Sequence, residues 1–379
     1  MRLRNREKML PDGLKGFFAA ALLALVLCGT TALGQQAAAQ AAAATAQSSP
    51  GVAPAPASVQ APQPADSQPG TPISPIDRGA TGQYTLRTNA YEVRLNVAVV
   101  DGSGRSVQSL DKDAFRVFED NVPQTITSFR HEDLPVSLGI LIDSSGSMYY
   151  KRPAVDAASL DLVKLSNPED EAFLVDFSWE AFIDQDFTNS IDKLQQGLSY
   201  IKSSGGTAIY DALVASADYL SKNAKHPKQV LLVITDGEDN ASSATLEQAI
   251  RRIQDFDGPV VYCIGLLFGD DTSKSESRLA RRVLETLSEQ TGGVAYFPKS
   301  LKEVDAITKE VANDIRTQYT IAYHSTKPPE LGGYRVVRVE AKDKNTGKLS
   351  VRTRSGYYPR VTPAAQSSPA ATATPAAAQ

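Results

Sequence analysis

Five oxygen-bearing side chains stand in loops of this 379-residue sequence, each just after an apolar run or just before a helix-length segment. Two are carboxylates and three are hydroxyls, and none is a histidine or a cysteine. Oxygen-only ligation selects a hard divalent cation, so Mg²⁺ is the natural choice, with Mn²⁺ or Ca²⁺ as alternatives. The candidate metal ligands are Asp143, Ser145, Ser147, Thr207 and Asp236.

The elements that must position these ligands are short apolar runs that alternate with helix-length amphipathic segments from residue 136 onward. Runs such as 230–235 are apolar on both faces and have to be covered on both sides. This order predicts an α/β fold, a doubly wound and mostly parallel sheet with helices on both faces. Such sheets bind ligands at the carboxyl ends of their strands, so the five ligands should meet at one edge.

The apolar and amphipathic patterns give approximate boundaries for these elements. Strands are expected at 136–142, 172–177, 182–187, 230–235, 260–266 and 294–297, and helices at 154–165, 191–201, 209–223, 246–256, 278–290 and 301–317. Segment 182–187 follows its predecessor too closely for a crossover, so it should be an antiparallel edge strand. Thr245 with Gln248, and Ser300 with Glu303, have the spacing of helix capping boxes.

Residues on either side of the α/β segment alternate between polar and apolar, as half-buried strands do. We expect residues 83–133 and 318–360 to form one small all-β, sandwich-like domain, into which the α/β domain of residues 134–317 is inserted. Three strands with one polar face are marginal alone, and the C-terminal strands would complete their burial. Two separate β appendages are the alternative.

The two ends of the chain have a different composition. Basic residues precede a core of about 12 apolar residues in the first 34, as in a signal peptide, and this core is short for a membrane span. An uncleaved N-terminal anchor is the alternative. Residues 35–82 are rich in Ala, Pro and Gln and predict a disordered linker, and residues 361–379 a disordered tail. The protein should therefore be exported, to the periplasm, the cell surface or the medium.

Overall charge and cysteine content exclude several classes of function. Lys and Arg number 39 against 43 Asp and Glu, for a formal charge of −4, which gives no support to a surface that binds nucleic acid or an anionic membrane. Two cysteines and three histidines exclude a disulfide framework or a Cys/His zinc site. Cys263 lies within an apolar run and is expected to be a buried packing residue.

The Asp-x-Ser-x-Ser element at residues 143–147, together with the separate Thr207 and Asp236, resembles the metal-ion-dependent adhesion site of the von Willebrand factor type A (VWA) domain. All five positions of that site are present, and the resemblance covers residues 134–316. It implies direct metal contact for the two serines and the threonine. It implies contact for the two aspartates either directly or through water.

The whole chain is similar to an exported bacterial family described as acidobacterial VWFA-related, a family without a defined activity. The similarity rests on the signal peptide, on the segment 113–120 (DAFRVFED) in the preceding β region, and on the closing Gly356-Tyr357-Tyr358.

These features predict a non-enzymatic protein-binding or adhesion module that captures an Asp or Glu side chain of a partner protein through the cation. One alternative is a structural envelope component whose metal site only stabilises the fold. Another is a serine hydrolase using Ser145 or Ser147, although no Gly-x-Ser-x-Gly motif surrounds them. A partner-binding rim is proposed beside the metal, with ordinary packing or a solvated loop as the alternative: Tyr149, Tyr150, Trp179, Glu238 and Asp239.

Overall fold

The computed structural model describes residues 4–5, 76–78, 84–86, 92–268, 273–343 and 347–360. The predicted signal peptide apart from Arg4 and Asn5, most of the predicted linker and the predicted tail lie outside the described residues. Within the described ranges, no helix combines the length and the apolar character that crossing a membrane requires.

Two short strands are described in the unit Asp12–Thr88. β2 (Ile76–Arg78) and β3 (Tyr84–Leu86) pair in antiparallel fashion. β2 falls where a linker without structure was expected. Ile76 in β2, and tyrosine and threonine in β3, favour extended backbone, and the Ala/Pro/Gln composition of the segment before β2 obscured this local preference.

A second compact unit, Met1–Pro11 with Asn89–Gln379, contains a seven-stranded sheet of order β1-β10-β9-β8-β11-β12-β13. Neighbouring strands are parallel except for β9 and β10, which are antiparallel. The prediction of a mostly parallel, doubly wound sheet is therefore confirmed. The strands are β1 (Arg4–Asn5), β8 (Val136–Asp143), β9 (Glu171–Phe177), β10 (Ala181–Thr188), β11 (Lys228–Thr235), β12 (Val260–Gly265) and β13 (Ala295–Tyr296). β10 is antiparallel as expected, but β1 lies beyond it at the sheet edge.

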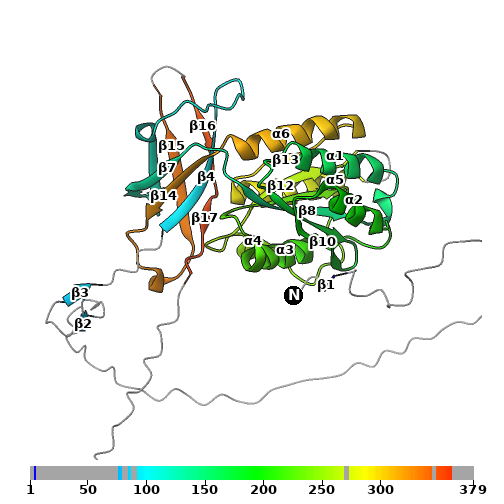
Figure 1. Ribbon diagram of the computed structural model, residues 1–379, viewed down its shortest axis with the longest axis horizontal. Helices are drawn as coiled ribbons and strands as arrows, with labels where there is room; N and C mark the ends of the chain where they lie inside the picture. Colours follow the sequence, from blue (N-terminus) through cyan, green and yellow to red (C-terminus); the bar gives the residue numbers. More distant parts are fainter. Residues whose placement is uncertain are drawn as a thin grey trace, which may run out of the picture. The chain divides into compact units, whose positions relative to one another are not determined.

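Helices cover both faces of this sheet because the strand residues are apolar on both sides (Figure 1). One face packs against α1 (Arg152–Lys164), α2 (Ile191–Tyr200) and α6 (Val304–Arg316). The other packs against α3 (Ile209–Asn223), α4 (Leu246–Ile253) and α5 (Lys274–Thr291). Cys263 lies in the second of these cores, fully buried as predicted.

Two helix starts test the predicted capping boxes. The Thr245 hydroxyl accepts from the Gln248 amide and the Gln248 side chain accepts from the Thr245 amide, so this box is confirmed. The second prediction is wrong, because the Ser300 side chain makes no cap hydrogen bond. Instead Glu303 accepts from the Lys299 amide, and a short 3-10 turn, η4 (Leu301–Glu303), precedes α6.

Strands from before and after the α/β part pair with each other in two four-stranded antiparallel sheets. Their orders are β16-β4-β14-β7 and β17-β15-β5-β6. The strands are β4 (Glu92–Val100), β5 (Phe115–Glu119), β6 (Val122–Gln124), β7 (Ile126–Arg130), β14 (Tyr319–His324), β15 (Arg335–Ala341), β16 (Ser350–Arg352) and β17 (Gly356–Tyr357). Alternate side chains of both sheets share one apolar core, which accounts for the two-residue periodicity of the sequence.

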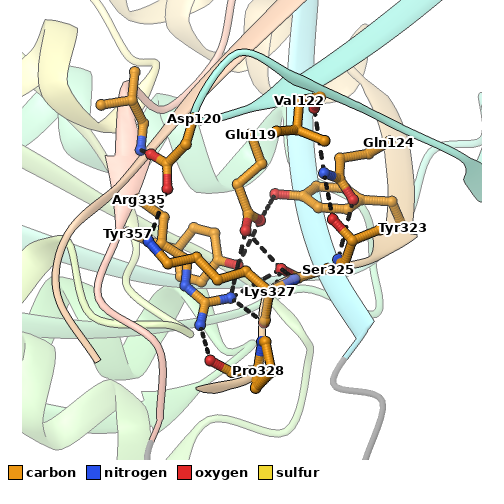
Figure 2. A network of polar contacts seen from close by, with 12 residues as sticks. Glu119, Asp120, Val122, Gln124, Tyr323, Ser325, Lys327, Pro328, Arg335 and Tyr357 are labelled. Carbon is orange, nitrogen blue, oxygen red and sulfur yellow. Dashed lines mark hydrogen bonds and ion pairs between the residues drawn. The ribbon is translucent and has the colours of Figure 1, made fainter. Parts of the chain in front are cut away.

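A buried polar network ties these strands together (Figure 2). Glu119 is 2% exposed and accepts hydrogen bonds from the hydroxyls of Tyr323 at 2.7 Å and Tyr357 at 2.8 Å. Arg335, 1% exposed, lies 3.4 Å from the Glu119 carboxylate and donates to the Pro328 carbonyl. Burial, with the Glu119 charge adding to it, raises the pKa of Tyr357 to about 12. Glu119 of the segment 113–120 and Tyr357 of the closing Gly-Tyr-Tyr thus meet in one network.

Candidate metal centre at the carboxyl edge of the sheet

Asp143 is the last residue of β8 and is fully buried. One carboxylate oxygen accepts from the Ser145 amide at 2.8 Å, and the other accepts from the Thr235 hydroxyl at 2.6 Å. Burial raises the pKa of Asp143 to about 6, and the nearby Asp236 charge acts in the same direction, whereas the Thr235 hydrogen bond opposes the shift. The carboxylate is therefore held in one orientation at a site that disfavours negative charge without a compensating cation.

Ser145, Ser147 and Asp236 form a continuous chain of oxygen atoms beside Asp143. The two serine hydroxyls lie 3.1 Å apart, and Ser147 Oγ donates to Asp236 Oδ1 at 2.8 Å. The serines come from the loop and the 3-10 turn η3 (Gly146–Met148) that follow β8, and Asp236 follows β11 directly. Because β8 and β11 are parallel neighbours, their carboxyl ends bring these three residues together.

Thr207 reaches the same place from the loop before α3. Its amide donates to Asn240 Oδ1 at 2.9 Å, and its carbonyl accepts from the amides of Asn240 and Ala241, so this loop is pinned to the one that follows Asp236. A Cβ atom added to Gly237 would lie 3.8 Å from Thr207 Oγ1. The structure thus places all five predicted ligand residues in or beside loops at one edge of the sheet.

The donor set fits a small hard cation. Oxygen ligands about 2.1 Å from an ion in octahedral geometry are about 3 Å apart along each edge, and the serine and Asp236 oxygens have separations of 2.8 and 3.1 Å. The described residues contain no group of three or more His, Cys, Asp or Glu side chains that could hold a metal. A cation at this edge would therefore depend on hydroxyl as well as carboxylate oxygens.

Several residues that support the centre were not identified from the sequence. Ser144 donates its hydroxyl to Asp176 Oδ2 at 2.7 Å, and its carbonyl accepts from the Ser204 amide, which fixes the loop after β8. Lys151 donates to Asp236 Oδ2 at 2.6 Å. These contacts join positions that are distant in the sequence. Only the Asp143–Thr235 pair had a sequence signal, since both residues end neighbouring apolar runs.

The proposed rim residues occupy different environments. Tyr149 and Tyr150 are 63% and 86% exposed, and their rings pack edge to face at 5.1 Å. Trp179 is 65% exposed and lies against Gly205 and Gly206, where an added Cβ would come within 2.8 Å of the indole. This contact places the indole beside the loop that carries Thr207.

The acidic members of the rim differ from each other. The Asp239 carboxylate accepts from the Tyr210 amide at the start of α3 and from the Ser242 hydroxyl at 2.5 Å. These bonds give Asp239 a role in joining the two loops. Glu238, directly after Gly237, is partly exposed.

The described contacts give no catalytic arrangement around the serines. All three histidines lie within the described ranges, and none is a hydrogen-bond partner of Ser145 or Ser147: His131 packs on Tyr319, and His226 pairs with the Glu169 carbonyl near the start of β11. A cavity of about 390 Å³ lies at the opposite, amino-terminal edge of the sheet, lined by residues such as Lys228 and Val260. None of the five candidate ligands lines it.

Comparisons with known proteins show which family part of this chain is similar to. The family model of the von Willebrand factor type A domain matches residues 138–238, a stretch that includes all five candidate ligands. A search of curated proteins finds no match.

Among solved structures, a von Willebrand factor type A protein from Catenulispora acidiphila is 15% identical, with a TM-score of 0.41, and the match covers 70% of this chain and 73% of that one. The vWF domain of the type V pili tip protein Mfa5 from Porphyromonas gingivalis is 13% identical, with a TM-score of 0.39 and coverage of 48% and 95%. The conserved hypothetical protein BatB from Bacteroides thetaiotaomicron is 18% identical, with a TM-score of 0.37 and coverage of 47% and 98%. The family-model match alone shows that residues 138–238 are similar in sequence to a von Willebrand factor type A domain.

Proposed function

We propose that this protein is a non-enzymatic binding module that captures an Asp or Glu side chain of a partner protein through a divalent cation. The observation that carries the proposal is the convergence of two buried carboxylates and three hydroxyls at one sheet edge. The match of residues 138–238 to the VWA family supports it. Mg²⁺ is the proposed cation, because the donor set contains only oxygen.

The five proposed ligands would contribute to cation binding in two ways, according to their charge. Ser145, Ser147 and Thr207 supply neutral oxygens, while Asp143 and Asp236 supply the two negative charges, directly or through water. Two carboxylates balance a divalent ion without exceeding its charge, and a bound cation would supply a positive point for an external carboxylate. The exposed Tyr149, Tyr150 and Trp179 would then contact the partner around that point.

We also propose export through the N-terminal segment, on the basis of its basic flank and short apolar core. A cleaved signal peptide predicts that the mature protein begins near residue 35. Amino-terminal sequencing of the protein recovered from the native cell envelope or medium tests this, and an intact residue 1 would contradict it.

Affinity capture from envelope extracts tests partner binding. The immobilised wild-type chain is compared with two variants, Asp143→Ala and Asp113→Ala. Asp113 carries an exposed carboxylate directly before β5, in the part of the chain that forms the two antiparallel sheets. We expect one protein to be retained in Mg²⁺ by the wild type and by Asp113→Ala, and to be released by EDTA. Equal recovery on Asp143→Ala, or recovery that is indifferent to EDTA, would instead favour a metal site that only stabilises the fold.

A further inference from the structure

Lys151 is a basic side chain built into the candidate metal centre. Its Nζ lies 2.6 Å from Asp236 Oδ2, and Asp236 Oδ1 accepts from Ser147. Both oxygens of this candidate ligand are therefore engaged, one of them by a positive charge.

The ammonium is held in place rather than free in solvent. Lys151 directly precedes α1, and its amide donates to the Met148 carbonyl in the turn that follows Ser147. Its side chain is only 14% exposed and that of Asp236 is fully buried. The ammonium also lies 5.9 Å from the centroid of the Phe268 ring. A pair shielded in this way interacts far more strongly than an exposed ion pair.

The positive charge of Lys151 has two electrostatic effects on a divalent cation site. The two candidate carboxylate ligands cancel the charge of a divalent cation, and the fixed ammonium adds one positive charge directly beside this set. A positive neighbour opposes cation binding and favours the approach of an anion. These two effects have opposite signs.

Resting on the proposed function, we propose that Lys151 weakens the binding of the cation itself and strengthens the binding of a carboxylate to the cation-loaded site. Lys151 is thus a specificity-determining residue that favours acidic partners. A lysine that merely supported the loop would affect both steps in the same direction, because its loss would loosen Asp236 and weaken both.

The test uses the full chain and the variants Lys151→Met, Lys151→Gln and Lys151→Arg. Calorimetry with MgCl₂ measures cation affinity. The water-proton relaxation of the Mn²⁺-loaded protein, titrated with sodium acetate, measures carboxylate binding as acetate displaces metal-bound water. Circular dichroism identifies any variant that does not fold, and Lys151→Gln, which keeps a polar end, replaces Lys151→Met in that case.

For Lys151→Met we expect about tenfold tighter Mg²⁺ binding and about tenfold weaker acetate binding, with Lys151→Arg close to the wild type. Unchanged affinities, or a parallel loss of both, in folded Met and Gln variants would overturn the role of Lys151 while leaving the proposed function in place. A wild-type chain that binds no Mg²⁺ would overturn both.

Discussion

At the scale of single residues, both carboxylates of the candidate metal centre are buried within the chain itself. Asp143 is fully buried, and among the described residues it accepts from the Thr235 hydroxyl and from the Ser145 amide but from no basic side chain. Its raised pKa is the electrostatic cost of that position. A cation bound at this position would offset the cost of burying the negative charge of Asp143.

Asp143→Asn should therefore stabilise the metal-free protein at neutral pH. The folded-state pKa of about 6 lies above the ordinary value of 3.8, so the stabilising contribution of the protonated carboxyl is complete below pH 3.8 and is lost as the pH rises through 6. In EDTA at pH 7.5 we expect the variant to gain roughly 3 kcal/mol in free energy of unfolding, and the gain to fall towards zero below pH 4.

The same variant should lose the stabilisation that Mg²⁺ gives to the wild type, since a bound ligand stabilises only the fold that holds it. Urea unfolding in EDTA and in Mg²⁺ measures both effects. A variant that is less stable than the wild type in EDTA at pH 7.5 would show that the Asp143 charge is already compensated within the protein.

At the scale of elements, the sequence indicates which strand ends carry the candidate residues but not the contacts that hold those residues in place. The apolar runs before Asp143 and Asp236 predict neighbouring strands, and the rule that ligands bind at strand carboxyl ends brings the two residues together. α3 was predicted with its observed boundaries. The Lys151–Asp236 pair and the Asn240 bonds to Thr207 could not be predicted, because they depend on side-chain orientations between loops that are far apart in sequence.

Other elements were missed because their signals are short. β6 contains only three residues, one of them a proline, and gives no alternating pattern of its own. It is specified instead by the turn at Asp120 and Asn121, whose positive φ angles of 48° and 66° suit a two-residue hairpin. Ser273 and Glu276 form a capping box at the start of α5, four residues before the helix expected there.

The loop that carries Thr207 gives a prediction at this scale. Gly205 has a φ of 91°, and a Cβ there would lie 2.6 Å from Trp179 Cδ1. Gly205→Ala should displace the indole and the loop, lower the free energy of unfolding by about 1–3 kcal/mol, and weaken Mg²⁺ binding. Trp179 is the only tryptophan, so its fluorescence reports the displacement directly.

Gly104→Ala is the matched control. Gly104 has a φ of 83°, but an added Cβ there would have no atom within 4 Å, and the residue lies in a turn of the antiparallel part. It should carry a similar backbone strain without a change in tryptophan emission or Mg²⁺ affinity. Identical effects of the two variants would mean that the Trp179 contact does not organise the loop.

At the scale of the whole molecule, strands that precede the α/β segment in the sequence pair with strands that follow it. β14 follows α6 in the sequence and pairs with β4, which precedes β8 by more than thirty residues. Arg352 of β16 also pairs with Asp314 of α6 at 2.5 Å, and Arg354 donates to the Phe256 carbonyl after α4. The fold class was predictable from the change in periodicity, whereas these contacts were not.

The Glu119 network should control the stability of the antiparallel part. Glu119→Ala leaves Arg335 buried without its carboxylate and should cost about 3–5 kcal/mol in free energy of unfolding. Glu340→Ala, which removes the carboxylate paired with the partly exposed Arg338, should cost less than about 1 kcal/mol. Urea unfolding of the two variants checks this, and equal losses would contradict the importance of burial.

The most direct test of the central claim is a calorimetric titration of the metal-free chain with Mg²⁺. The wild type and Asp113→Ala should bind one ion with similar affinity, and Asp143→Ala should bind about 100-fold more weakly or without measurable heat, because it loses one of the two proposed carboxylate ligands. Binding of equal affinity by Asp143→Ala, or no binding by the wild type, would contradict a cation-dependent site at the carboxyl edge of the sheet.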